Sequence, residues 1–229
     1  MRALLAAMAL TGMFTTTQAV ADSPVVVELY TSQGCSSCPP ADAFLHELAK
    51  RDDVIALALH VDYWDYIGWK DSFATPEYTA RQHAYAQSFN AAVVYTPQMV
   101  INGKEHVVGS RTVQVMDGIM RHQAAASSVD VSVTRSGGAV EISADADEEG
   151  DYLVQLVRYT PQETIAIRRG ENAGRELSYA NVVRKWDVVG RWDGSSALNL
   201  RAAAEGDEPV VVLIQQAGHG AIVGAAQLR

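Results

Sequence analysis

The chain has 229 residues, of which 48% are hydrophobic and 20% are charged, and its formal net charge is −9. This composition is that of a globular protein rather than a disordered one, and the length suits one large or two small domains. The negative charge argues against electrostatic binding to nucleic acid or to an anionic membrane surface, because both require Lys and Arg to face phosphates.

The first 21 residues have the pattern of an export signal. Arg2 provides a positive start, residues 3–14 are an apolar run, and Ala19 and Ala21 are small residues at the two positions that a signal peptidase reads. The apolar run is too short to span a bilayer. We therefore expect a signal peptide over residues 1–21, a periplasmic or secreted mature chain, and no stable membrane insertion after the signal is removed.

A strand, a helix and a second strand open the mature chain. Residues 25–30 are β-branched and apolar, which predicts a buried strand. Apolar residues at helical spacing after Cys38 predict an amphipathic helix to about Lys50. Residues 54–61 are apolar without alternation, which is typical of a strand covered on both faces. Together these elements predict a parallel βαβ unit with a right-handed crossover.

An aromatic segment, residues 62–72, follows the second strand. The capping hydroxyl of Thr75 and the proline after it predict a helix to about Asn90. Asn102-Gly103 predicts a two-residue hairpin turn. The other elements expected in this half are short strands at residues 98–101 and 105–108 and a helix at residues 110–123.

The pattern changes after a linker of small residues at 124–128. No convincing long helix follows, and Ser136-Gly137-Gly138 predicts a hairpin turn between strands 129–134 and 139–144. Further strand candidates are residues 152–159, 164–168, 182–189, 210–216 and 222–228. We expect residues 129–229 to form a β-rich domain that resembles an antiparallel sandwich. The glycine-bounded stretch 170–174 is interpreted as a solvated β-turn, with an anion site as the alternative.

Cys35 and Cys38 are the two cysteines of the chain. Disulfides of exported proteins normally connect distant segments, whereas a bridge across two residues closes almost no loop and adds little stability. At the start of a helix, backbone N–H groups and the helix dipole favour a thiolate on the first cysteine. The second cysteine lies close enough to resolve a mixed disulfide. We therefore predict that Cys35 is a redox nucleophile and Cys38 the resolving thiol.

A metal site and an inert pair are the alternatives to redox chemistry. One Cys-x-x-Cys supplies two ligands, whereas a closed zinc site needs four, and the histidines show no ligand spacing. Copper binding by two thiolates is less easily excluded. We predict no cofactor and no metal, and keep copper as an alternative.

Thr96-Pro97 precedes a predicted strand and is the second half of the same signature. In thioredoxin-like folds a cis-proline at this place faces the cysteines, and both the spacing from Cys35 and the following hairpin and helix match that arrangement. We therefore expect a cis Pro97 beside the cysteines, with Thr96 as a substrate contact. With the βαβ unit, this predicts a thioredoxin-like α/β domain over residues 22–124.

Glu28 is an acid inside the apolar first strand. A buried carboxylate is costly unless it is paired or protonated. One interpretation is that Glu28 relays a proton to the resolving thiol, and the other is that it lies at a strand end and bonds to the backbone. For Tyr63 and Trp64, the choice is between a substrate platform beside the cysteines and packing against the neighbouring helix or the second domain.

The chain resembles a bacterial secreted family that is known as domain of unknown function 1223. The resemblance is carried by residues 28–42 (ELYTSQGCSSCPPAD), 60–66 (HVDYWDY), 96–98 (TPQ), 169–172 (RGEN) and 179–183 (YANVV). It covers nearly the whole mature chain and implies a thioredoxin-like N-terminal fold with a β-rich C-terminal half. It supplies no established substrate or reaction.

The leading functional hypothesis is an exported thiol–disulfide oxidoreductase that acts on protein or small-molecule thiols. It rests on an isolated Cys-x-x-Cys, the expected cis-proline and an oxidising compartment. A periplasmic copper carrier and a non-enzymatic partner-binding module are the alternatives.

Overall fold

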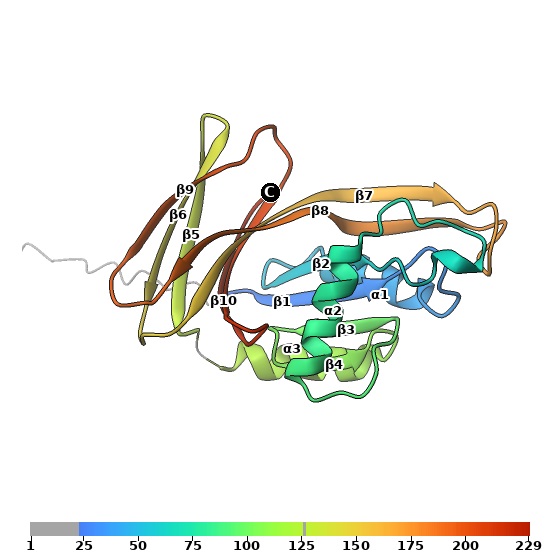
Figure 1. Ribbon diagram of the computed structural model, residues 1–229, viewed down its shortest axis with the longest axis horizontal. Helices are drawn as coiled ribbons and strands as arrows, with labels where there is room; N and C mark the ends of the chain where they lie inside the picture. Colours follow the sequence, from blue (N-terminus) through green and yellow to red (C-terminus); the bar gives the residue numbers. More distant parts are fainter. Residues whose placement is uncertain (1–22, 126) are drawn as a thin grey trace, which may run out of the picture.

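The computed structural model describes residues 23–125 and 127–229 (Figure 1). The predicted signal peptide, residues 1–21, lies outside the described residues. In the part of the chain that the structure describes, no helix has the length and apolar character needed to cross a membrane.

A mixed eight-stranded sheet runs through the molecule in the order β11-β10-β7-β8-β2-β1-β3-β4 (Figure 1). Its strands are β1 (Val25–Thr31), β2 (Val54–His60), β3 (Gln98–Ile101), β4 (Glu105–Val108), β7 (Tyr152–Ala166), β8 (Glu176–Trp192), β10 (Val210–Gln216) and β11 (Ile222–Leu228). β1 and β2 are parallel, as the βαβ prediction requires, and β3 and β4 form the predicted hairpin at Asn102-Gly103. Both turn residues have positive φ, which Asn and Gly tolerate best.

The predicted fold class is wrong. We expected a thioredoxin-like α/β domain followed by a separate β-sandwich, but the protein is built mostly from strands, and its largest sheet contains strands from both halves of the chain. The two halves join at the edge of β2 that faces away from β1, where Ala58 pairs in parallel with Val182 of β8. Beyond this junction the sheet continues with strands from the C-terminal half alone: β8 pairs with β7, and β7 pairs with β10. The C-terminal strands therefore extend the first sheet instead of forming an independent domain.

Two helices cover one face of the β1–β4 part of this sheet and one helix covers the other. α1 (Pro39–Leu48) and α3 (Thr112–Gln123) share an apolar cluster with Val25, Val27 and Leu29 of β1. α2 (Pro76–Ser88) packs through Tyr78 and Tyr85 on the opposite face, which carries the alternate β1 residues. The side-chain oxygen of Thr75 caps α2 at the predicted place.

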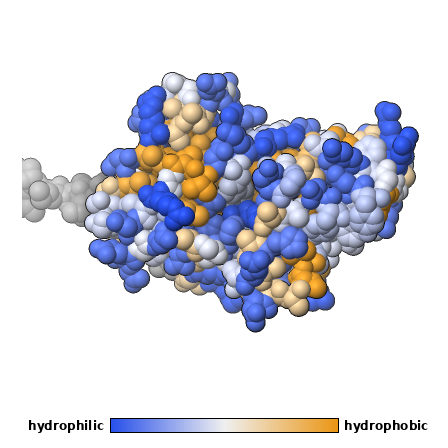
Figure 2. Space-filling model, viewed as in Figure 1, coloured by the Kyte–Doolittle hydropathy of each residue, from blue (hydrophilic) through white to orange (hydrophobic). Residues whose placement is uncertain are grey.

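A three-stranded antiparallel sheet occupies the end of the molecule away from the helices (Figure 1). It contains β5 (Val129–Ser136), β6 (Ala139–Ala146) and β9 (Leu198–Ala203), in the order β5-β6-β9. The β5–β6 hairpin was predicted and β9 was not. Figure 2 shows that this face of the molecule is largely hydrophilic, with more than one apolar area, one of them over the three-stranded end.

Candidate functional site

The cysteine pair lies between the end of β1 and the start of α1. Cys35 and Cys38 form a disulfide, and Cys38 is the N-cap of α1, with proline in the first turn of the helix. The backbone N–H of Cys35 donates to the carbonyl of Ser32 at 3.1 Å. Both cysteines are fully buried, whereas the two serines between them, Ser36 and Ser37, are exposed.

Thr96 lies against Cys35 and is followed by a cis-proline, Pro97. The Thr96–Pro97 peptide bond is cis, as the sequence predicts, and the Thr96 hydroxyl donates to Cys35 Sγ at 3.3 Å. Trp64 Nε1 donates to the same Thr96 oxygen at 2.8 Å. Ser37 Oγ lies 3.4 Å from Cys35 Sγ and donates to the Thr96 carbonyl. Of the residues singled out in the sequence, Thr96 therefore contacts the first cysteine directly, and Trp64 and Pro97 adjoin Thr96.

The aromatic segment closes over the cysteine loop because Gly34 has no side chain. A Cβ at Gly34 would lie 3.2 Å from Trp64 Cβ and 3.4 Å from the side chain of Ile67, which belongs to the short 3-10 helix η1 (Asp65–Ile67). Tyr63 points elsewhere: its hydroxyl donates to Gln82 of α2 at 3.1 Å. Burial raises the pKa of Tyr63 to about 12. Trp64 thus covers the cysteine loop, and Tyr63 anchors the segment to α2.

Gln33 is a residue that the sequence did not indicate. Its side chain accepts a hydrogen bond from Trp69 Nε1 at 2.7 Å and donates to Ser72 Oγ at 3.2 Å. Its backbone N–H donates to Asp71 Oδ2 at 2.8 Å. Gln33 is fully buried, so one side chain and one amide fix the second half of the aromatic segment to the cysteine loop.

The stretch 170–174 is a largely exposed turn, as expected, but Asn172 within it is buried. The turn joins β7 to β8 and lies beside η1 at the end of the molecule (Figure 1), where a Cβ on Gly170 would approach Trp69 Cβ to 3.2 Å. Asn172 is 1% exposed and donates from Nδ2 to the carbonyl oxygens of Gln33 (2.9 Å) and Cys35 (3.0 Å). The C-terminal half of the chain therefore contributes a residue to the cysteine loop.

Glu28 points to the α2 face of the sheet. Its carboxylate accepts two hydrogen bonds from Arg81, at 2.7 and 2.9 Å, and one each from the hydroxyls of Tyr85 (2.6 Å) and Tyr30 (3.1 Å). Glu28 and Arg81 therefore form a buried ion pair, and both carboxylate oxygens of Glu28 accept hydrogen bonds. None of them reaches a cysteine, so a proton-relay role for Glu28 stays a prediction that these contacts do not favour.

Asp42 is the buried carboxyl group on the cysteine helix. Burial raises its pKa to about 7, although the hydrogen bond that it accepts from Thr31 Oγ1 at 2.7 Å acts to lower it. His60 opposes the shift and Asp71 adds to it. Asp42 Oδ2, His60 Nε2 and the Tyr179 hydroxyl are all buried and have no hydrogen-bond partner.

His60, Asp71 and Tyr179 are the polar neighbours of Asp42, and burial and charge change the pKa values of Asp71 and Tyr179. His60 Nδ1 lies 2.7 Å from Asp71 Oδ2, and the His60 ring packs edge-on to that of Tyr179. Burial would raise the pKa of Asp71, but His60 and two backbone N–H groups lower it overall. Burial raises the pKa of Tyr179, and the charges of Asp42 and Asp71 raise it further. Asp42 is therefore the carboxyl of this cluster that titrates near neutral pH.

No metal cluster supports the copper alternative. Among residues 23–125 and 127–229, no group of three or more His, Cys, Asp or Glu side chains could hold a metal ion. The cysteine pair alone would supply two thiolates after reduction.

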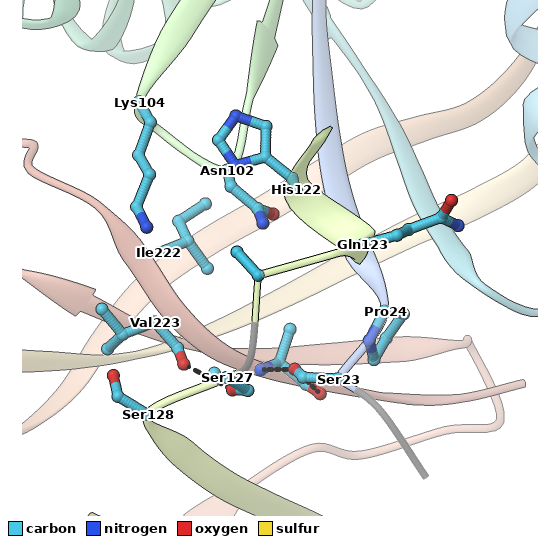
Figure 3. Close-up of a pocket in the computed structure, with 13 residues that line it drawn as sticks. Ser23, Pro24, Asn102, Lys104, His122, Gln123, Ser127, Ser128, Ile222 and Val223 are labelled. Atoms are coloured by element: carbon cyan, nitrogen blue, oxygen red, sulfur yellow. Dashed lines mark hydrogen bonds between the residues drawn. The ribbon is translucent and has the colours of Figure 1, made fainter. Parts of the chain in front are cut away.

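Two cavities lie away from the cysteines. The one in Figure 3 has a volume of about 50 Å³ and lies at the start of β1, the opposite end of that strand from Cys35. Two of its polar side chains already bond to the backbone of β11: Ser23 Oγ accepts from the Ala225 N–H at 3.0 Å, and Ser127 Oγ donates to the Val223 carbonyl at 2.8 Å. A cavity of about 520 Å³ lies between α2 and β8 and is lined by neither cysteine. Both cysteines are buried, and neither of these two cavities is lined by them.

Comparisons with known proteins cover most of the chain. The family model described as "Protein of unknown function (DUF1223)" matches residues 26–215. The crystal structure of protein AGR_C_4864 from Agrobacterium tumefaciens is 36% identical, covers 92% of this chain and 96% of its own, and has a TM-score of 0.79. HBP35 of Porphyromonas gingivalis is 14% identical over 90% of this chain and 75% of its own, with a TM-score of 0.65, a likeness of fold alone. No curated protein matches the sequence.

Proposed function

The chain belongs to the DUF1223 family, whose function is unknown, and on that premise we propose that it is an exported thiol–disulfide oxidoreductase that uses Cys35 and Cys38. The observation that carries the proposal is the contact between Cys35 Sγ and the hydroxyl of Thr96, beside the cis Pro97, in a disulfide that spans two residues. A bridge this short closes almost no loop, so constraint of the unfolded chain gives little reason for its presence.

The proposed reaction exchanges disulfides through Cys35. A substrate thiolate attacks Cys35 Sγ, the Cys35–Cys38 bond breaks, and Cys38 leaves as a thiolate that takes up a proton. A second substrate thiolate then attacks the substrate sulfur of the mixed disulfide, and Cys35 leaves as a thiolate. The balance is one protein disulfide and two substrate thiols converted into one protein dithiol and one substrate disulfide. The same steps in reverse reduce a substrate.

Access to Cys35 requires movement, because its side chain is fully buried in the disulfide form. Ser37, Trp64 and Thr96 reach the surface around Cys35, since Ser37 is exposed and the other two are half-buried. We assign Trp64 and Thr96 to substrate contact on this basis. The Thr96 hydroxyl contacts Cys35 Sγ, and the Trp64 indole bonds to the same hydroxyl.

Asp42 is our candidate for the group that exchanges a proton with Cys38. Cys38 has helical dihedral angles, φ −78° and ψ −34°, and its carbonyl accepts from the Asp42 N–H at 3.1 Å. Residues four apart on a helix have Cβ atoms about 5–6 Å apart. With a pKa of about 7, the Asp42 carboxyl can accept and release a proton near neutral pH.

Turnover with single-cysteine variants tests the proposal. Wild type, Cys35→Ser and Cys38→Ser are compared for reduction of insulin and for oxidation of a reduced dithiol peptide. We expect neither variant to turn over, and only Cys38→Ser to accumulate a mixed disulfide, because Cys35 attacks and Cys38 resolves. Equal activity of Cys35→Ser and wild type would show that the pair does not carry the reaction.

A further inference from the structure

The turn between β7 and β8 is built to present one side chain to the cysteine loop. The Ile167 N–H donates to the Arg175 carbonyl and the Gly174 N–H to the Ile167 carbonyl, each at 2.8 Å, which closes the base of the turn. Gly170 has φ +75°, where a side chain would be strained, and approaches Trp69. The turn is thus fixed both internally and against the aromatic segment.

Asn172, in this turn, uses both polar atoms of its side chain. Its Nδ2 donates to the carbonyl oxygens of Gln33 and Cys35 at 2.9 and 3.0 Å, and its Oδ1 accepts from Arg175 Nη1 at 2.9 Å. The carbonyls of Gln33 and Cys35 flank Gly34, so one amide group holds both ends of this bend. Buried backbone carbonyls need such partners. Within the loop, the Cys35 carbonyl also accepts from the Cys38 N–H, at the longer distance of 3.3 Å.

We propose that Asn172 is a positioning residue that sets the redox equilibrium of the Cys35–Cys38 pair from 137 residues away in the sequence. The proposal rests on the redox function proposed above and adds the role of the C-terminal half in it. Asn172 holds the Cys35 backbone where the oxidised protein has it. The same hydrogen bonds in the reduced protein keep the Cys35 thiol near Cys38, which raises their effective concentration and favours disulfide closure.

Loss of the two hydrogen bonds from Asn172 should shift the equilibrium of the cysteine pair toward the dithiol. Without the two hydrogen bonds the reduced loop samples more conformations, so the dithiol is favoured and the reduction potential becomes less negative. We expect about a tenfold change in the equilibrium constant, which is about 30 mV for a two-electron couple.

Asn172→Asp is the sharpest test, because aspartate keeps the shape and the acceptor for Arg175 but lacks the two donors. Asn181→Asp is the matched control: Asn181 is also buried and donates from Nδ2 to a backbone carbonyl, that of Ala56 in the middle of β2, at 2.8 Å. The readout is the equilibrium constant of the full-length protein with reduced and oxidised glutathione, measured by alkylation and mass spectrometry.

We expect both variants to unfold at lower temperature and only Asn172→Asp to shift the constant about tenfold. A constant within twofold of wild type, or an equal shift in Asn181→Asp, would overturn the proposal. If Asn172→Asp does not fold, Arg175→Ala carries the test, because Arg175 is exposed and its loss frees Asn172 Oδ1. A smaller shift in the same direction is then expected, and an unchanged constant would overturn the proposal. The glutathione equilibrium needs no substrate turnover, so failure of the oxidoreductase proposal would show separately in the insulin and peptide assays.

Discussion

Replacing Asp42 by Asn should make stability less dependent on pH. Burial raises the pKa of Asp42 from 3.8 to about 7, so the folded protein binds this proton more tightly than the unfolded chain does. Stability therefore falls as pH rises from about 4 to about 7, because the unfolded chain has already lost the proton that the folded state retains. This rise in pKa corresponds to about 4 kcal/mol of destabilisation, which is absent well below pH 4 and fully present about one pH unit above 7.

The Asn variant removes this dependence but has a cost of its own. Asn can still accept from Thr31 Oγ1, yet its Nδ2 takes the place of an oxygen that has no partner, at about 1–3 kcal/mol. That cost is independent of pH. The difference between variant and wild type should therefore change by about 4 kcal/mol in favour of the variant between pH 4 and pH 8.5.

The assay is urea unfolding of the oxidised proteins at a series of pH values. Asp207→Asn serves as the control, because Asp207 is exposed and should give a much smaller change. A difference between Asp42→Asn and wild type that is constant within about 0.5 kcal/mol from pH 4 to pH 8.5 would refute the reasoning.

Three further substitutions test the cover over the disulfide, the buried ion pair of Glu28 and the turn that holds Asn172. Trp64→Ala removes the cover over the disulfide and should speed its reduction by dithiothreitol several-fold; an unchanged rate would remove the gating role. Arg81→Met leaves Glu28 charged and unpaired in the core and should cost about 3–5 kcal/mol in urea unfolding, with recovery on adding Glu28→Met. The glutathione equilibrium should stay near wild type in that double variant, whereas a large shift would revive the proton relay at Glu28. Gly170→Ala forces a side chain into positive φ and should cost about 1–2 kcal/mol; equal stability would contradict the close packing of the turn.

Local patterns in the sequence predicted most of the site. The β-branched run of β1, the amphipathic α1 and the apolar β2 each form from short-range signals, and they place Cys35 and Cys38 at a strand–helix junction. Thr96-Pro97 was found by its position before a strand. Asp42 had a readable signal that was missed, because it lies three residues before Leu45 and therefore on the buried side of α1.

The joined sheet could not be predicted in the same way, because strand pairing between distant segments leaves little local signal. The fully buried run at the start of β10, Val210–Ile214, was nevertheless informative. A strand of a two-sheet sandwich normally alternates between core and solvent, whereas a strand covered on both faces does not. Asn172 was hidden for a different reason: its glycine-bounded stretch is typical of a solvated turn, and only the length of β7 and β8 brings it to the cysteine loop.

The equilibrium between the Cys35–Cys38 disulfide and its dithiol is the most direct test of the central claim, that this pair is redox-active and not structural. The measurement titrates the purified protein in glutathione or dithiothreitol buffers of known potential. The account predicts a reduction potential between about −270 and about −120 mV, the range of thiol–disulfide oxidoreductases. A potential below about −300 mV, which is typical of structural disulfides, would contradict it.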